Sequence, residues 1–125
     1  LSNQPIEVYG TGRQTRCFGH VSDVASALPR LLGTQACWGR VFNLGSDEEV
    51  SIRELAERVI AATGSTGGVR YVPYDQAYQT KFDDLARRVP DLSRVREAIG
   101  YEPSYDLNRI LEQLIGTARA TGATA

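Results

Sequence analysis

The residues with the clearest potential for chemistry lie in one short loop near the start of the chain. Its sequence, Gly10-Thr11-Gly12-Arg13-Gln14-Thr15-Arg16, follows the strand-like residues Ile6 to Tyr9. The two glycines allow a tight turn, and Gln14 and Arg16 carry N–H donors suited to an anion such as phosphate. An ordinary β-turn followed by a surface arginine has the same pattern, so the loop alone leaves both interpretations open.

The same loop does not match a dinucleotide-binding fingerprint. That fingerprint requires a third glycine, a helix that begins within the loop and a carboxylate about 20 residues further on. Here Thr15 stands in the place of the third glycine, and the next residues, Cys17 to Val21, have the character of a strand. We therefore predict a loop that holds a ligand but does not hold NAD, and we assign no cofactor-binding residue.

Spacing alone assigns no catalytic residue and no metal ligand. His20 is the single histidine, and a lone histidine at the end of a strand is more often packed and hydrogen-bonded than catalytic. Cys17 and Cys37 are too far apart in sequence for a zinc cluster or a redox pair. We expect both cysteines to be reduced thiols in the core.

The composition is that of an ordinary globular domain. The chain has 125 residues, 42% of them hydrophobic and 23% charged, with a net charge of -1. There is no overall positive field for nucleic acid or an anionic membrane, and no apolar stretch approaches the roughly 20 residues of a membrane span. We therefore expect no nucleic-acid partner, no membrane association and a cytoplasmic location.

Apolar spacing predicts the first helix and the strand after it. Ser22 is expected to cap a helix that ends near Gly33, and Pro29 should kink or shorten its second half. The run from Gly39 to Leu44 has the pattern of a buried strand.

The clearest helix begins at Ser51. Ser51 and Glu54 form a capping box, an apolar face follows, and Gly64 ends the helix. The next element is a strand at Val69 to Val72, ended by Pro73.

Two further helices complete the prediction. Asp91 and Asp106 are expected to cap them, and Gly100 to end the first of the two. The tail at residues 119–125 is small and polar and should fray. The predicted fold class is α/β, with α+β character: a short mixed sheet of three or four strands covered by about four helices.

Four distant segments together resemble one known family. Taken in order, they are similar to the C-terminal part of the NAD-dependent epimerase/dehydratase family, extended short-chain dehydrogenases that modify nucleotide sugars. The segments are Gly10-x-Gly12-x-Gln14-Thr15-Arg16-x-Phe18-x-His20-Val21-x-Asp23-Val24, Val41-Phe42-Asn43-Leu44-Gly45-Ser46, Arg88-x-Pro90-Asp91 and Ile99-Gly100-Tyr101-x-Pro103.

The resemblance implies a set of site residues. Arg16 and Arg88 would be the two arginines that clamp the diphosphate of a nucleotide-diphosphate sugar, which suits their forked guanidinium groups. Tyr9 matches an aromatic position near the nucleotide base, and Gln14 lies where a polar contact to the ligand is expected. Cys17 and Gly19 depart from the family, which often has an aspartate and a bulky residue at these positions.

The resemblance also implies a division of labour. In the family, an N-terminal Rossmann lobe binds NAD and supplies the acid–base pair, and a small C-terminal lobe binds the sugar nucleotide. We expect residues 1–118 to be the second lobe only, inactive alone, with NAD bound by the parent enzyme through the absent lobe. A UDP-sugar 4-epimerase is the first choice for that parent, and UDP-glucuronate decarboxylase and dTDP-glucose 4,6-dehydratase are alternatives.

A free-standing, non-enzymatic ligand-binding module is the competing class. The two readings differ in what surrounds the site. A severed lobe should expose aromatic residues at Tyr74, Tyr78 and Phe82, and this surface could drive self-association or local mobility.

Overall fold

The computed structural model describes residues 2–74 and 85–122 and confirms the α/β class. The chain divides into two compact units. The first contains Leu1–Arg16, Val50–Arg88 and Leu111–Ala125, and the second contains Cys17–Glu49 and Val89–Ile110. Within the described residues there are four strands, which form two two-stranded sheets rather than a single sheet.

The first unit is built on a parallel pair of strands. β1 (Ile6–Tyr9) pairs with β4 (Val69–Val72), in a register that runs from Ile6 opposite Val69 to Tyr9 opposite Val72. Both strands were predicted from sequence, and both predictions are confirmed. Because the strands are parallel, Tyr9 and Val72 end at the same edge of this sheet.

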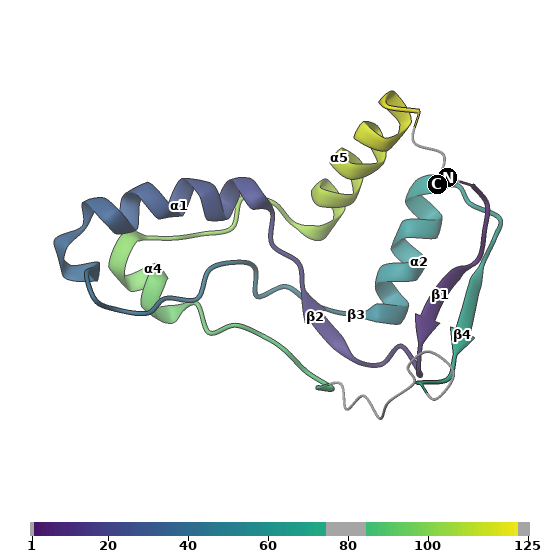
Figure 1. Cartoon of the computed structure of the whole chain (residues 1–125), viewed down its shortest axis with the longest axis horizontal. Coiled ribbons are helices and arrows are strands. Elements are labelled where there is room, and N and C mark those ends of the chain that lie inside the picture. Colours follow the sequence, from purple (N-terminus) through teal and green to yellow (C-terminus); the bar gives the residue numbers. More distant parts are fainter. Residues whose placement is uncertain (1, 75–84, 123–125) are drawn as a thin grey trace. The chain divides into compact units, whose positions relative to one another are not determined.

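Helix α2 (Ile52–Thr63) lies beside β1 (Figure 1). Its predicted start is confirmed, since the Ser51 hydroxyl accepts a hydrogen bond from the Glu54 N–H at 3.1 Å. Its predicted end is confirmed too, because Gly64 adopts a left-handed conformation with φ 70°. Ala56 and Val8 are buried in this unit.

Two of the boundaries between the units fall inside short strands. β2 (Thr15–Cys17) pairs with β3 (Glu49–Ser51). The sequence prediction of a strand over Cys17 to Val21 is wrong in its bounds, because β2 ends at Cys17 and a helix begins at Val21. β3 was not expected at all.

The second unit is organised around α1 (Val21–Gly33), which packs against α4 (Ser93–Ile99) and the short 3-10 helix η1 (Gln35–Cys37). Its core consists of apolar residues from α1, α4 and the segments that flank α4. Those residues are Ala27, Leu92, Val95 and Tyr101, with Leu31, Phe42, Leu44 and Ile99 packed against them.

Two expectations for α1 are wrong. The N-cap is His20 rather than Ser22, because the Nδ1 atom of His20 accepts a hydrogen bond from the Ser22 N–H at 3.2 Å. The helix also continues through Pro29 to Gly33. Proline removes a hydrogen bond to the carbonyl of Ala25, and Ala25 is exposed, so water can satisfy that carbonyl.

The predicted strand at Gly39 to Leu44 is also wrong, since this segment is irregular. It keeps the alternation that suggested a strand: Phe42 and Leu44 face the core, and Val41 is exposed. A strand needs a hydrogen-bonded neighbour, and no described strand lies next to this segment.

The two C-terminal helices follow the sequence closely. The N-cap of α4 is Leu92 rather than the expected Asp91, although a carboxylate oxygen of Asp91 accepts from the Ser93 N–H at 2.9 Å. Gly100 ends α4, as expected, with φ 59°. Asp106 accepts from the Arg109 N–H at 2.8 Å near the start of α5 (Leu107–Ala120). This helix extends past the expected boundary at residue 118, and residues 123–125 lie outside the described part.

The two cysteines are free thiols. Cys37 is buried, as expected, whereas Cys17 is only half-buried. The core position predicted for Cys17 is therefore not found.

Candidate functional site

The four predicted site residues all belong to the first unit. Tyr9 is the last residue of β1, and Gln14 lies in the loop that follows. Arg16 lies in β2, and Arg88 lies near the start of the chain segment that resumes at residue 85. The candidate site would therefore be formed by the carboxyl end of β1, the loop after it, β2 and one distant segment.

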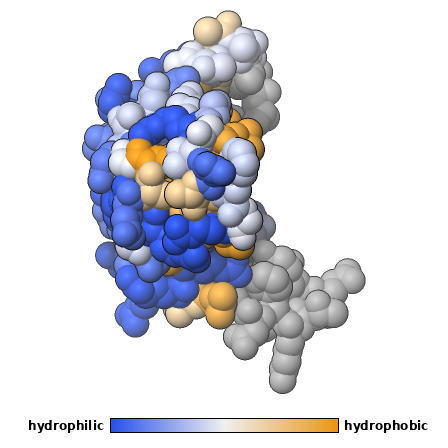
Figure 2. Space-filling model, turned by 90° about the vertical axis from the view of Figure 1, so that its left-hand side faces the viewer, coloured by the Kyte–Doolittle hydropathy of each residue, from blue (hydrophilic) through white to orange (hydrophobic). Residues whose placement is uncertain are grey.

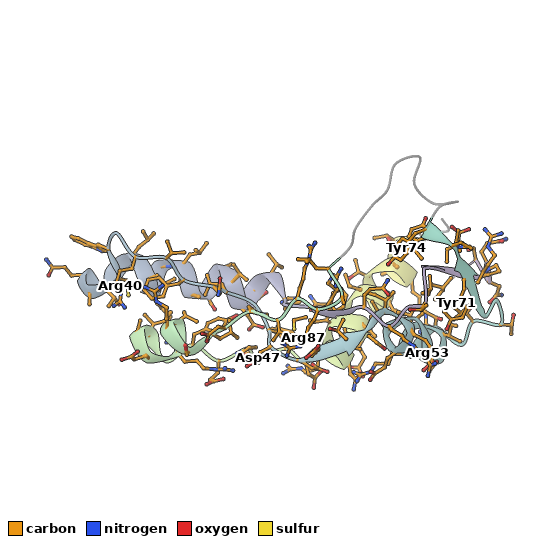
Figure 3. The ribbon with its side chains drawn as sticks, turned by 90° about the horizontal axis from the view of Figure 1, so that it is seen from below. Arg40, Asp47, Arg53, Tyr71, Tyr74 and Arg87 are labelled. Atoms are coloured by element: carbon orange, nitrogen blue, oxygen red, sulfur yellow. The ribbon has the colours of Figure 1, made fainter. Side chains whose placement is uncertain are left out.

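The glycines of the loop are required by both backbone conformation and packing. Gly10 has φ +68° and Gly12 has φ +69°, a region that other residues rarely adopt. A Cβ atom on Gly10 would lie 2.2 Å from Cε2 of Tyr74, so the tyrosine ring rests directly against the turn (Figure 3). Tyr74 is thus half-buried rather than stranded, and Tyr78 and Phe82 lie outside the described residues.

The loop is docked on the amino end of α2. The Arg53 N–H donates to the carbonyl of Gly12 at 2.9 Å, and the Ile52 N–H donates to the carbonyl of Gln14 at 3.0 Å. The Glu54 N–H is bound by Ser51. Since the first three N–H groups of the helix already have partners in the protein, this helix end is not a phosphate site.

Gln14 helps to close the loop. Its Nε2 atom donates to the carbonyl of Tyr9 at 3.1 Å, across the turn. The side chain of Tyr9 stays partly exposed, at 38%. The loop thus presents an aromatic ring at the strand end while its backbone is bonded to α2 and β4.

The segments that carry the two arginines lie side by side. Thr15 and Arg87 form a parallel bridge, and the Thr15 N–H donates to the carbonyl of Ala86 at 2.8 Å. Figure 3 labels Arg87. Arg16 and Arg88 each lie one residue further along these two segments. Because the bridge is parallel, it makes them neighbours in register although they are far apart in the sequence.

Arg16 also has a role in holding this arrangement together. Its Nη1 atom donates to the carbonyl of its neighbour Thr15 at 2.6 Å and to the carbonyl of Leu85 at 2.9 Å. Arg16 is half-buried and Arg88 is exposed. The shared contact of both guanidinium groups with one diphosphate stays a prediction.

In the second unit, the motif residues form a scaffold. Asp23 is 5% exposed, and its two carboxylate oxygens accept from the N–H groups of Ser104 at 3.0 Å and Tyr105 at 3.3 Å. His20 stacks on Tyr105 with ring centroids 4.0 Å apart. The expectation that His20 is packed and hydrogen-bonded is confirmed, whereas sequence reasoning missed the partners of Asp23.

The turn at Asn43 and Gly45 is scaffold as well. The Asn43 amide donates to the carbonyl of Asp91 at 3.1 Å, and the buried Tyr101 hydroxyl donates to the carbonyl of Gly45 at 2.9 Å. Burial raises the pKa of Tyr101 above its ordinary value. A Cβ atom on Gly19 would lie 3.0 Å from the Cα of Gly45, so the departure from the family at Gly19 allows close backbone packing.

Within residues 2–74 and 85–122, no cluster of three or more histidine, cysteine or acidic side chains could hold a metal ion. None of the helices in the same ranges is long and apolar enough to cross a membrane.

Comparison with known proteins identifies the family. The family model described as GDP-mannose 4,6 dehydratase matches residues 1–114. A curated relative, the UDP-N-acetyl-alpha-D-glucosaminuronate decarboxylase of Bacillus cytotoxicus, is 31% identical over 115 residues, which make up 92% of this chain and 36% of the relative.

Solved structures show the same fold. An epimerase from Methanothermobacter thermautotrophicus matches with a TM-score of 0.86 and 25% identity, over 96% of this chain and 34% of that protein. The UDP-glucuronic acid 4-epimerase of Bacillus cereus, in complex with UDP-glucuronic acid and NAD, matches with a TM-score of 0.81 and 21% identity, over 95% of this chain and 36% of that protein.

The chain spans about a third of the length of these related proteins. The match to the family model covers most of its residues, and the fold agrees with the solved structures. The chain therefore belongs to the GDP-mannose 4,6-dehydratase family, among the NAD-dependent epimerases and dehydratases of the extended short-chain dehydrogenase type.

Proposed function

We propose that this chain binds the nucleotide-diphosphate part of a UDP-sugar and orients it for an NAD-dependent enzyme. Arg16 and Arg88 face the diphosphate, Tyr9 lies near the base, and Gln14 fixes the loop between them. The parallel bridge between Thr15 and Arg87 is the observation that carries the proposal.

The bridge supports the pairing of the arginines through simple strand geometry. Side chains alternate between the two faces of an extended segment, so paired residues and their successors fall on opposite faces. By this alternation, we expect Thr15 and Arg87 on one face and Arg16 and Arg88 on the other. Two adjacent guanidinium groups repel each other, and a diphosphate between them relieves this repulsion.

The hydrogen bonds that Arg16 makes within the protein are compatible with a role in ligand binding. Nη1 binds two backbone carbonyls, which fixes the side chain in one orientation. A guanidinium group has five N–H donors, so one arginine side chain can serve several acceptors at once. Arg16 thus combines support of the segment around Leu85 with ligand binding.

The described part of the chain lacks the backbone arrangement of a dinucleotide-binding loop. Gly12 is followed by β2 instead of a helix, and the amino end of α2 is occupied by the loop and by Ser51. We therefore propose that this chain itself does not bind NAD, and we derive no step that uses the cofactor. Its contribution is the binding and orientation of the substrate.

Two reactions are candidates for the whole enzyme. The structural relatives that act on UDP-sugars as 4-epimerases support our first choice, a UDP-sugar 4-epimerase. The curated relative at 31% identity is a decarboxylase, and this favours the second candidate, decarboxylation of a UDP-uronate. The whole enzyme given UDP-glucuronate and NAD separates them, since only the second reaction releases carbon dioxide.

Calorimetric titration of the 125-residue chain with UDP tests the binding role. We expect UDP to bind more tightly than UMP, and Arg88→Gln to weaken UDP binding about 10- to 100-fold, the effect of one lost charge-assisted contact. Arg70→Gln is the matched control, because Arg70 is an exposed arginine of the same unit that pairs with Glu7. NAD should give no saturable heat.

The opposite results are equally clear. If Arg70→Gln weakens UDP binding as much as Arg88→Gln, the effect is one of general charge and the assigned site is wrong. If UDP does not bind to the folded chain at all, as judged by circular dichroism of the same sample, the nucleotide role fails.

A further inference from the structure

The loop after β1 is held at two separate places. At its start, the Gly10 N–H donates to the carbonyl of Val72 at 2.8 Å, which extends the pairing of β1 with β4 by one residue. At its end, Thr15 forms the parallel bridge with Arg87. The start of the loop adjoins the proposed base contact, Tyr9, whereas its end adjoins the arginines of the proposed diphosphate contact.

The ring of Tyr74 lies against the start of this loop. A Cβ atom on Gly10 would overlap Cε2 of the ring and would lie 2.9 Å from both Cδ2 and Cζ (Figure 3). The ring therefore fills the space that a side chain at residue 10 would need. Since β4 ends at Val72, this ring comes from the chain just beyond the strand that pairs with β1.

This contact differs from the hydrophobic side chains that reach the surface of the second unit. Figure 2 faces the side of the molecule on which α1 ends, and shows separate hydrophobic patches in a hydrophilic surface. The chain spans about a third of the length of its relatives, so exposure alone indicates no ligand. Tyr74, in contrast, is half-buried and has a defined contact within the candidate site.

A ring at this place restricts a backbone that is otherwise unusually free. Glycine has more accessible backbone conformations than any other residue, and Gly10 adopts φ +68°. Packing of the Tyr74 ring against Gly10 disfavours the alternatives. A loop that is already ordered binds its ligand without the cost of ordering the loop.

We propose that Tyr74 is a positioning residue for the base of the nucleotide. Its ring holds the turn at Gly10, and this turn sets the orientation of Tyr9, the proposed base contact. Tyr74 acts through the loop rather than by touching the ligand. This inference rests on the proposed function, because Tyr9 is the group through which Tyr74 acts.

The diphosphate contact should depend much less on Tyr74. Arg16 is held by hydrogen bonds to the carbonyls of Thr15 and Leu85, and the parallel bridge sets its register with Arg88. These contacts are made by the two arginine segments themselves. Loss of the Tyr74 ring should therefore loosen the base contact and leave the diphosphate contact in place.

Calorimetric titration of the 125-residue chain with two probes separates the two contacts. UDP carries the base and the diphosphate, and inorganic pyrophosphate, measured by competition with UDP, carries the diphosphate alone. Tyr74→Ala should weaken UDP binding about tenfold and change pyrophosphate binding less than about twofold. Arg88→Gln should weaken the binding of both probes.

Three further variants control for the loss of a side chain. Tyr74→Phe keeps the ring and should retain the affinity for UDP. Tyr74→Leu fills part of the same space, should give an intermediate affinity, and replaces Tyr74→Ala if circular dichroism shows the alanine variant to be unfolded. Tyr71→Ala is the matched control, because Tyr71 is a tyrosine of β4 that is 49% exposed, and it should change neither affinity.

Gly10→Ala tests the contact itself. The added methyl group strains the backbone at φ +68° and also displaces the Tyr74 ring, so it should weaken UDP binding. When Tyr74→Ala is already present, only the backbone strain remains. The further loss caused by Gly10→Ala should then be smaller than the loss that it causes in the wild type.

Three results would overturn the role of Tyr74 while the proposed function still holds. The first is a Tyr74→Ala variant that binds UDP as tightly as the wild type. The second is an equal weakening of UDP and pyrophosphate by Tyr74→Ala, and the third is an equal loss from Gly10→Ala with and without the tyrosine. If the folded wild type binds neither probe, the proposed function itself fails, and the role of Tyr74 fails with it.

Discussion

The two units of the chain use their charged side chains in different ways. In the second unit, both carboxylate oxygens of buried Asp23 accept hydrogen bonds from backbone N–H groups of a distant segment. In the first unit, Arg88 is exposed and Arg16 is half-buried, on two segments joined by a short parallel bridge. The hydrogen bonds of Asp23 lie within its own unit and hold its backbone, whereas we propose that the two arginines bind a ligand.

This difference sorts the motif residues of the family into two groups. His20, Asp23, Asn43 and Gly45 have partners within the second unit and hold its backbone. Tyr9, Arg16 and Arg88 lie in the first unit, where we propose that they meet the ligand. Substitutions of His20, Asp23, Asn43 or Gly45 should therefore lower the stability of the fold. Substitutions of Tyr9, Arg16 or Arg88 should lower the affinity for the ligand.

The largest effect is expected at Tyr101. Its side chain is 2% exposed and lies in the core of the second unit, so Tyr101→Ala should cost about 3–5 kcal/mol of unfolding free energy. Tyr101→Phe keeps the ring and removes only the hydrogen bond to Gly45, and should cost about 1 kcal/mol. Urea unfolding measures both. Equal costs for the two variants would show that the ring is not part of the core.

Asp23 provides the next largest effect. Asp23→Ala leaves two buried backbone N–H groups without acceptors and should cost about 2–3 kcal/mol. Asp23→Asn keeps one acceptor oxygen and should cost less. The same variants should bind UDP with unchanged affinity once folded. A loss of UDP affinity without a loss of stability would move Asp23 into the ligand-binding group.

Ser51 tests stability in the first unit. Ser51→Ala removes the cap of α2 and should cost about 1 kcal/mol, and Ser51→Asp should restore most of it because aspartate is an equally good cap. Urea unfolding again provides the measurement. If Ser51→Ala costs more than Asp23→Ala, the first unit carries the stability and the comparison between the units is reversed.

The sequence predicted best those features whose cause lies within a few residues. Ser51 caps the start of α2 through a local hydrogen bond, and Gly64 ends the helix in a left-handed conformation. Both were recognised from residue type alone. The same applies to Gly100 and Asp106. Capping is a local property, so no knowledge of the fold is needed.

Features that depend on a distant partner were missed or misplaced. The segment Gly39 to Leu44 has strand-like alternation but lacks a described neighbouring strand, and β3 forms because β2 lies beside it. The acceptors of Asp23 bind residues more than 80 positions away, so burial of this carboxylate has no local signal. Pairing across the chain is what sequence spacing does not encode.

The candidate site contains both a local feature that the sequence predicts and a long-range pairing that it does not. The loop glycines were recognised from residue type, and their positive φ values confirm the turn. Arg88 had no signal of its own beside Arg87 and entered through the family resemblance. The bridge between Thr15 and Arg87 supplies the physical link that spacing could not.

The smallest effect concerns an ion pair on the surface of the second unit. Asp47 Oδ2 lies 2.8 Å from Nη1 of Arg96, which also bonds Glu102. The hydrogen bond from Arg96 lowers the pKa of Asp47 below its ordinary 3.8. The unfolded chain therefore takes up a proton before the folded protein does, and the contribution of Asp47 to stability is complete above about pH 4.

That contribution should be lost as the pH falls from 3.8 through the lower pKa of the folded state. Both side chains are partly exposed and screened by solvent, so we expect a small change. Unfolding free energies of the wild type and Asp47→Asn, measured from pH 6 to pH 3, should differ by a constant amount above about pH 4 and converge below it. Glu112→Gln, at an exposed position on α5, is the control. A gap that widens toward low pH would mean that the folded protein protonates Asp47 first, and the ion pair would then have no stabilising role.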